Sequence, residues 1–207
     1  MEVVLKGIFS GLVLAILVGP VFFTLLQTSI ERGFKSGVWV AVGIAMSDSL
    51  YVALSYLGLS NLFSSEKFQV YLAYFGGAII LCFGVYYLFI KSRKTLNFNP
   101  GHVQEKSSFR LMAKGFVING FNPMVLLFWI GTISIATGQL GYTEPAQGIT
   151  FLASIIATVF LTDVIKAKLA DKLRVLLTPR LIKIMNIVLG LVMFLLGTKL
   201  LLWRFLD

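Results

Sequence analysis

The stretch "FVINGFNPMVLLFW", residues 116–129, places an Asn-Pro pair inside an otherwise apolar run. Pro123 removes one backbone N–H and crowds the carbonyl group four residues earlier, which disfavours a continuous helix. As a helix start the pair is favourable, because Asn is a preferred N-cap and Pro is preferred at the first helical position. The pattern therefore predicts a helix broken at 122–123, whose second half begins inside the apolar run.

A second break of this kind is expected at Gly19-Pro20, in the first apolar run. A helix N-terminus inside the membrane presents unpaired N–H groups and about half a positive charge, which favours a bound carboxylate. Two such ends predict a site for a small anionic or zwitterionic molecule. The alternative is that each proline only kinks its helix, which membrane helices tolerate. The substrate-binding residues expected are Gly19, Pro20, Gln27, Asn119, Asn122 and Pro123.

The composition indicates an integral membrane protein. Of the 207 residues, 57% are hydrophobic and only 13% are charged, which is too apolar for an ordinary soluble domain. A helix needs about 20 mainly apolar residues to cross a bilayer. Six such stretches are present, and we expect an all-α protein with six membrane spans. They cover roughly 7–28, 37–60, 69–90, 115–138, 147–165 and 181–203.

The basic residues are distributed by loop, which indicates topology rather than nucleic-acid binding. Of the 18 Lys and Arg residues, 14 fall on one side of the membrane, in the loops that join spans one to two, three to four and five to six. By the positive-inside rule, these loops are cytoplasmic and both termini are periplasmic. The 14 residues are Arg32, Lys35, Lys91, Arg93, Lys94, Lys106, Arg110, Lys114, Lys166, Lys168, Lys172, Arg174, Arg180 and Lys183.

Few residues of the chain suit catalysis or metal binding. Cys82 is the only cysteine, which excludes an intrachain disulfide or a dithiol redox carrier. His102 lies in a polar loop, so the spans offer no histidine as a base or metal ligand. We therefore expect no enzyme, no cofactor, no metal site and no nucleic-acid partner.

The two halves of the chain resemble each other in order. "GLVLAILVGP" (11–20) matches "GFVINGFNP" (115–123), and "GAIILCFG" (77–84) matches "GLVMFLLG" (190–197). Each half would hold an odd number of helices, so the repeats would be inverted, as in many secondary transporters. The expected organisation is a single membrane domain, with one three-helix repeat at 1–91, a cytoplasmic linker at 92–112 and a second repeat at 113–207.

Two acidic residues lie within the predicted spans. Asp48 is near the middle of the second span, where a carboxylate costs about 2.5–3.5 kcal/mol to insert. It should face the bundle interior, where it could carry a proton or pair with a substrate ammonium group. Asp163 is the matching acid of the second half, although Lys166 follows closely and the two could lie at the cytoplasmic interface. A purely structural, hydrogen-bonded acid is the alternative for each.

These motifs together resemble the LysE/RhtB family of amino-acid exporters. The similarity is carried by the Gly-Pro pair of the first span, by "GFKSGVWVAVGIAMSD" (33–48), by "GAIILCFGVYYL" (77–88) and by "KGFVINGFNPMVLLFW" (114–129). A common form of the last motif has lysine after Asn-Pro, whereas this chain has Met124. The resemblance implies a bacterial inner-membrane protein that expels amino acids or their analogues by proton exchange.

The function expected is therefore secondary transport of a small zwitterion out of the cell, with protons as the exchanged ion. The expected partners are an amino acid or analogue, protons and the lipid bilayer, and a homodimer is left open. Two alternatives are an exporter of an inorganic cation, which would need several converging oxygen ligands, and an assembly subunit that transports nothing.

Overall fold

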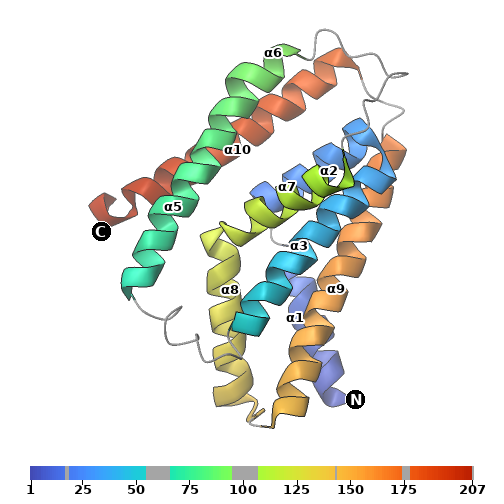
Figure 1. Ribbon diagram of the computed structural model, residues 1–207. Coiled ribbons are helices and arrows are strands. Elements are labelled where there is room, and N and C mark those ends of the chain that lie inside the picture. The colour runs from blue at the N-terminus through green and yellow to red at the C-terminus, as the bar shows by residue number, and fades with distance from the viewer. Residues whose placement is uncertain (17–18, 55–65, 95–106, 143, 174–177, 207) are drawn as a thin grey trace.

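The computed structural model describes residues 1–16, 19–54, 66–94, 107–142, 144–173 and 178–206. Within these residues, all regular structure is helical (Figure 1). In chain order the elements are α1 (Glu2–Ile16), α2 (Pro20–Arg32), α3 (Phe34–Leu54), α5 (Glu66–Val85), the π-helical turn η2 (Tyr86–Lys91), α6 (Ser92–Lys94), α7 (Ser108–Gly120), α8 (Pro123–Ser134), the π-helical turn η4 (Ile135–Gln139), α9 (Pro145–Lys172) and α10 (Pro179–Leu206).

Four helical segments in the described part of the chain are long and apolar enough to cross a membrane. Two further spans arise if each bent helix pair counts as one, which gives up to six. The predicted end of the second span, beyond Leu54, lies outside the described residues, as does most of the predicted linker. Helix α7 already begins at Ser108, inside the range 92–112 that the sequence assigned to that linker.

Both predicted breaks are present. Helices α1 and α2 meet at an angle of 76°, and α7 and α8 meet at 66°. Gly19, in extended conformation (φ −165°, ψ −169°), is the N-cap of α2 and Pro20 is its first residue. Asn122 is the N-cap of α8, and its side-chain oxygen accepts a hydrogen bond from the Met124 amide at 3.1 Å. The chain therefore starts a new helix at each proline, as the N-cap and proline preferences require.

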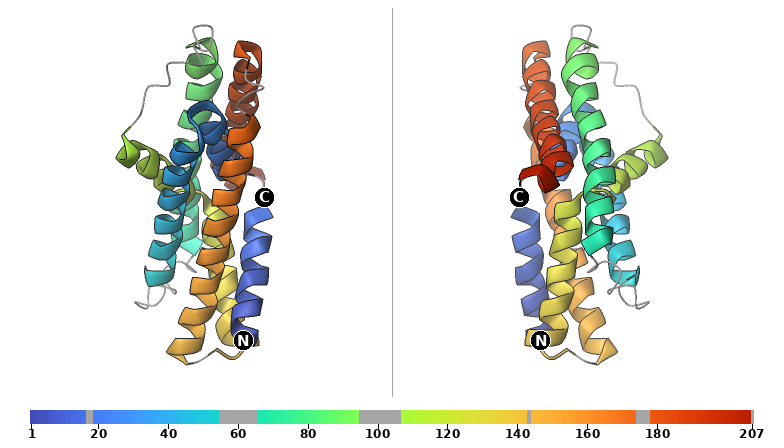
Figure 2. Two further views of the ribbon diagram at one scale, coloured as in Figure 1. Left: turned by 90° about the vertical axis from the view of Figure 1, so that its right-hand side faces the viewer. Right: turned by 90° about the vertical axis from the view of Figure 1, so that its left-hand side faces the viewer.

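The first half of each broken helix packs against a long helix from the other half of the chain. Helix α1 lies along α9, and α7 crosses α3 (Figures 1 and 2). Glycines allow both contacts: a methyl group on Gly7 would lie 2.6 Å from Ser154 Cβ, and one on Gly43 or Gly115 would meet backbone atoms of the facing helix. Small residues at such crossings let helix backbones approach closely in a membrane.

Helices α5 and α10 form an antiparallel pair beside this group (Figure 1). Their glycines face each other in reciprocal fashion, Gly77 against Gly197 and Gly84 against Gly190. A methyl group on Gly84 would lie 2.6 Å from the Phe194 amide nitrogen. The four matching glycines of the sequence are therefore contact points between these two helices.

The largest buried apolar cluster lies between α8 and α9. Its members include Trp129, Phe151 and Ile155, each at most 1% exposed. Tyr51 of α3 joins the cluster and donates a hydrogen bond to the carbonyl oxygen of Gly120, at the end of α7. This cluster packs side chains of the second broken helix against the long helix α9.

Candidate functional site

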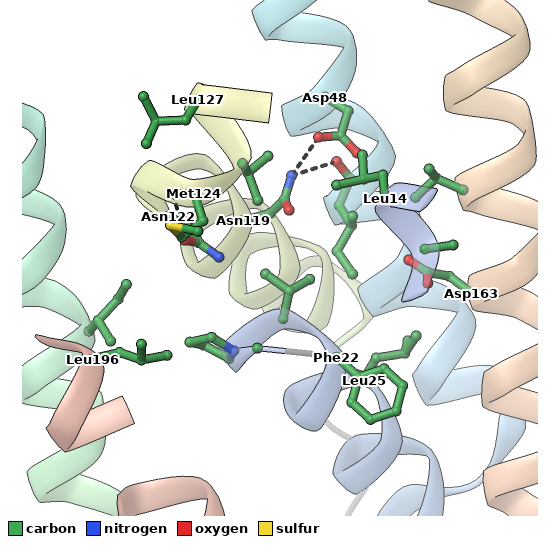
Figure 3. Close-up of a pocket in the computed structure, with 18 of the residues that line it drawn as sticks. Leu14, Phe22, Leu25, Asp48, Asn119, Asn122, Met124, Leu127, Asp163 and Leu196 are labelled. Atoms are coloured by element: carbon green, nitrogen blue, oxygen red, sulfur yellow. Dashed lines mark hydrogen bonds between the residues drawn. The ribbon is translucent and has the colours of Figure 1, made fainter. Parts of the chain in front are cut away.

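A cavity of about 460 Å³ lies between the two helix breaks (Figure 3). Residues from both breaks line it, and so do residues from α3, α5, α9 and α10. The polar or charged lining residues are Asp48, Asn119, Asn122, Asp163, Lys166 and Lys199, and Gly19 and Pro20 add the start of α2. The remainder of the wall is largely apolar, a composition typical of sites for small molecules.

Asp48 projects from α3 to meet α7 and α8 at the cavity (Figure 3). The residue is 1% exposed. Its Oδ1 accepts one hydrogen bond from Asn119 Nδ2 and one from Trp129 Nε1, each at 2.9 Å. Two donors on one oxygen hold the carboxyl group in place, and Oδ2 remains to take up a proton or to meet a cation.

Asp163 and Lys166, both from α9, form an ion pair in the cavity wall. Lys166 Nζ lies 2.8 Å from Asp163 Oδ1 and also donates to the carbonyl oxygen of Ala15 at 2.7 Å. Ala15 is in the last turn of α1, where carbonyl groups lack helical partners and a cation is favourable. Both residues line the cavity. Helix α9 continues to Lys172, so Lys166 lies within a helix, and its assignment to the loop between the fifth and sixth spans is wrong.

The two helix starts at the cavity differ in how their N–H groups are used. At α8, the side chain of Asn122 already accepts the hydrogen bond from Met124 N, so that donor is occupied. At α2, Gly19 has no side chain that could cap the helix, and Gly19, Pro20, Val21 and Phe22 all line the cavity. The first N–H groups of a helix have no partner within the helix. The start of α2 is therefore the stronger candidate for an anion site.

Gln27 does not line this cavity. It is buried on another side of α2, where its Nε2 donates to Glu31 Oε1 at 2.6 Å and to the side-chain oxygen of Asn186 in α10. Glu31 in turn pairs with Lys91, with Oε2 and Nζ 2.8 Å apart. Gln27 thus belongs to a polar network that joins α2, α10 and η2, and the sequence-based expectation of a substrate contact has no geometric support for this residue.

Two residues of the cavity wall, Lys166 and Lys199, and one residue behind it, Trp129, were not expected as site residues from the sequence. Trp129 anchors Asp48 from α8, Lys166 links α9 to α1, and Lys199 contributes from α10. The spacing of Asp163 and Lys166, three residues apart, was the available signal for Lys166. Among the described residues, no group of three His, Cys, Asp or Glu side chains is placed to hold a metal ion.

The cavity offers two carboxylates and two lysines, so it can receive both charges of a zwitterion. A multi-pass helical membrane protein with such a cavity between two broken helices has the organisation of a small-solute transporter. This chain belongs to the LysE type translocator family, which it matches over residues 12–204.

Several proteins similar to this chain are named for the efflux or export of amino acids. The protein YcgF of Bacillus subtilis (strain 168), named for amino acid efflux, is 28% identical over 88% of this chain and 87% of its own length. The arginine exporter protein ArgO of Klebsiella pneumoniae subsp. pneumoniae is 26% identical over 94% of this chain and 91% of its own length. A threonine efflux protein of Salmonella typhi is 23% identical over 75% and 77%, respectively. No solved structure matches the chain.

Proposed function

We propose that this protein exports an amino acid across the bacterial inner membrane in exchange for protons, and that the cavity between the two helix breaks is its transport site. The observation that carries the proposal is the meeting of an uncapped helix start, two carboxylates and two lysines in one cavity of about 460 Å³. Arginine and threonine, which give two relatives their names, share an α-ammonium and an α-carboxylate group. The site would recognise these shared groups.

The substrate carboxylate is assigned to the start of α2. There Val21 and Phe22, which carry the first N–H groups of the helix, line the cavity, Gly19 has no side chain to cap them, and the helix dipole favours an anion. The amide nitrogen of Asn122 adds a donor from the opposite break, because its oxygen is held by Met124 N. The role we assign to Pro123 is indirect, because it starts α8 and so fixes where that helix begins.

The proton is assigned to Asp48. This carboxyl group is held by two donors and faces the cavity, so it can change protonation state as substrate comes and goes. Asp163 is balanced by Lys166, and this pair suits the substrate ammonium group better, because an arriving cation could compete with Lys166 for the carboxylate. In this scheme amino acid and proton occupy neighbouring sites in the same cavity.

Two inverted repeats would give the cavity alternating access. Contacts in one half have counterparts in the other. Helix α1 packs on α9, and its counterpart α7 packs on α3. Asp48 accepts a hydrogen bond from Asn119 of α7, and the ion pair of its counterpart Asp163 contacts α1 through Lys166. The glycine contacts between α5 and α10 show the same symmetry: if the two halves are exchanged, the contact of Gly77 with Gly197 becomes the contact of Gly190 with Gly84. Rocking of one half against the other around a fixed site would then expose it to each side in turn, with both termini periplasmic.

Counterflow in proteoliposomes tests whether an amino acid is carried. Vesicles are loaded with one unlabelled amino acid and diluted into a trace of the same labelled compound, across a panel of amino acids. We expect transient accumulation of label for at least one of them and none in protein-free vesicles. This assay needs no ion gradient, so it reports the transport site alone. Folded protein that shows no counterflow with any amino acid would contradict the proposed substrate class.

A further inference from the structure

A second cavity, of about 400 Å³, lies between the end of α2, the turn η2 and the start of α7, and the described residues that line it are all different from those of the first. Four basic side chains line it, and among the described lining residues Glu31 is the acidic one. The basic residues are Arg32, Lys91, Arg110 and Lys114. All four belong to the basic set that the positive-inside rule assigns to the cytoplasmic side.

One cation of this basic pocket, Lys114, has no acid partner among the residues that the structure describes. Lys91 forms an ion pair with Glu31, and its Nζ lies 2.8 and 3.1 Å from the two carboxylate oxygens. Lys114 Nζ donates instead to the hydroxyl of Thr28 at 3.0 Å and lies 5.8 Å from the ring centre of Tyr87. Among the described residues, no carboxylate comes within ion-pair distance of Lys114. The ammonium group of Lys114 is partly removed from water, and its neighbours are a neutral hydroxyl and an aromatic ring. Burial of a charge is costly unless it is paired, so an anion beside this group would be strongly favoured.

Exposed aromatic side chains lie on the same elements as the basic pocket. Tyr86, which lines the pocket, is 41% exposed, and Phe89 on the same turn is 56% exposed. Phe109, next to Arg110 at the start of α7, is 71% exposed. In a membrane protein such outward apolar groups contact lipid chains, so the pocket lies where lipid head groups and chains meet. This position distinguishes the pocket from a cluster of loop lysines in water.

We propose that the basic pocket binds the phosphate head group of an anionic phospholipid from the cytoplasmic leaflet. Lys114 and Arg110 on α7 supply the donors that are not used by Glu31, and Lys91 adds charge from η2. The acyl chains would lie along the outward apolar side chains of η2 and α7. Basic pockets between membrane helices on the cytoplasmic side are suited to such head groups. The assignment is independent of which solute the protein transports.

Thermal unfolding of the full chain in a non-ionic detergent tests this assignment. The midpoint is measured with a short-chain phosphatidylglycerol, with a phosphatidylcholine of the same chain length, and with inorganic phosphate. Phosphatidylglycerol at saturation is expected to raise the midpoint of the wild type by roughly 5 °C more than phosphatidylcholine does. Lys114→Gln should lose most of this difference. Lys35→Gln, which removes an exposed cation of α3 outside the pocket, should keep it.

Three outcomes would overturn the proposal. These are an equal shift with phosphatidylcholine, an equal shift in Lys114→Gln and Lys35→Gln, or the full shift with inorganic phosphate alone, which would mark a site for a soluble phosphate. If Lys114→Gln does not fold, Arg110→Gln replaces it. Arg110 is exposed at the start of α7, and its substitution should reduce the phosphatidylglycerol shift in the same direction.

Discussion

Asp48→Asn is expected to abolish the accumulation of amino acid driven by a pH gradient while counterflow persists. The carboxyl group of Asp48 faces the cavity with Oδ1 fixed by Asn119 and Trp129. Asparagine has nearly the same shape and keeps an oxygen that can accept both hydrogen bonds. It cannot take up a proton. The substitution therefore removes the proton site and leaves the cavity and its other contacts in place.

The expected size of this effect follows from the driving force. A pH difference of one unit is worth about 1.4 kcal/mol for each proton exchanged, which corresponds to about tenfold accumulation of substrate. The wild type should approach this ratio per proton, and Asp48→Asn should stay near equal concentrations inside and outside. The measurement is uptake of the amino acid identified by counterflow, in proteoliposomes with a set internal and external pH.

Asp171→Asn is the matched control for Asp48. Asp171 lies near the end of α9 and does not line the cavity, so its loss should leave accumulation unchanged. Wild-type accumulation in Asp48→Asn would rule out the proton role. If Asp48→Asn loses both counterflow and accumulation, Asp48 would instead be assigned to the substrate ammonium group, which is the second role that the sequence allowed.

Gly19→Ser is expected to weaken amino-acid affinity by about ten- to hundredfold with almost no change in stability. Serine is a good N-cap, and its hydroxyl oxygen would accept a hydrogen bond from the first turn of α2. That donor is the one we assign to the substrate carboxylate. A hydrogen bond to a charged group is worth about 1.5–3 kcal/mol, which gives the expected loss. Exchange of Gly for Ser at an N-cap alters helix stability by only a few tenths of a kcal/mol.

Gly19→Ala separates the lost donor from the added bulk. A Cβ at Gly19 would meet no atom of the described residues within 4 Å, and the extended backbone there suits any residue. Alanine adds this carbon but no acceptor, so affinity should fall much less than in Gly19→Ser. The measurement is the concentration dependence of counterflow, with thermal unfolding as the check on folding. Equal affinities in the two variants would contradict the assignment of the carboxylate to α2.

The helix breaks could be predicted from the sequence because their cause is local. Pro20 and Pro123 each disfavour continuation of the preceding helix, and Gly19 and Asn122 suit the N-cap position that a new helix requires. The burial of Asp48 was predictable as well, since a carboxylate in an apolar span must avoid lipid. Neither inference depends on how the helices are arranged in space.

The partners of these residues could not be predicted in the same way. Gln27 lies only eight residues after Gly19, but the direction in which α2 faces depends on the 76° bend, which the sequence does not specify. Trp129 reaches Asp48 because α8 packs beside α3, a contact across 81 residues. Lys166 has the appearance of an interfacial cation until the full length of α9 is known. In each case tertiary packing decided the outcome.

The measurement that most directly tests the exchange of amino acid for protons uses a pH-sensitive dye inside proteoliposomes. The internal and external pH are equal at the start, and the amino acid identified by counterflow is added outside. Exchange predicts that the lumen becomes alkaline as amino acid enters and protons leave, and that Asp48→Asn shows no such change. Amino-acid entry without any change of internal pH would contradict the account.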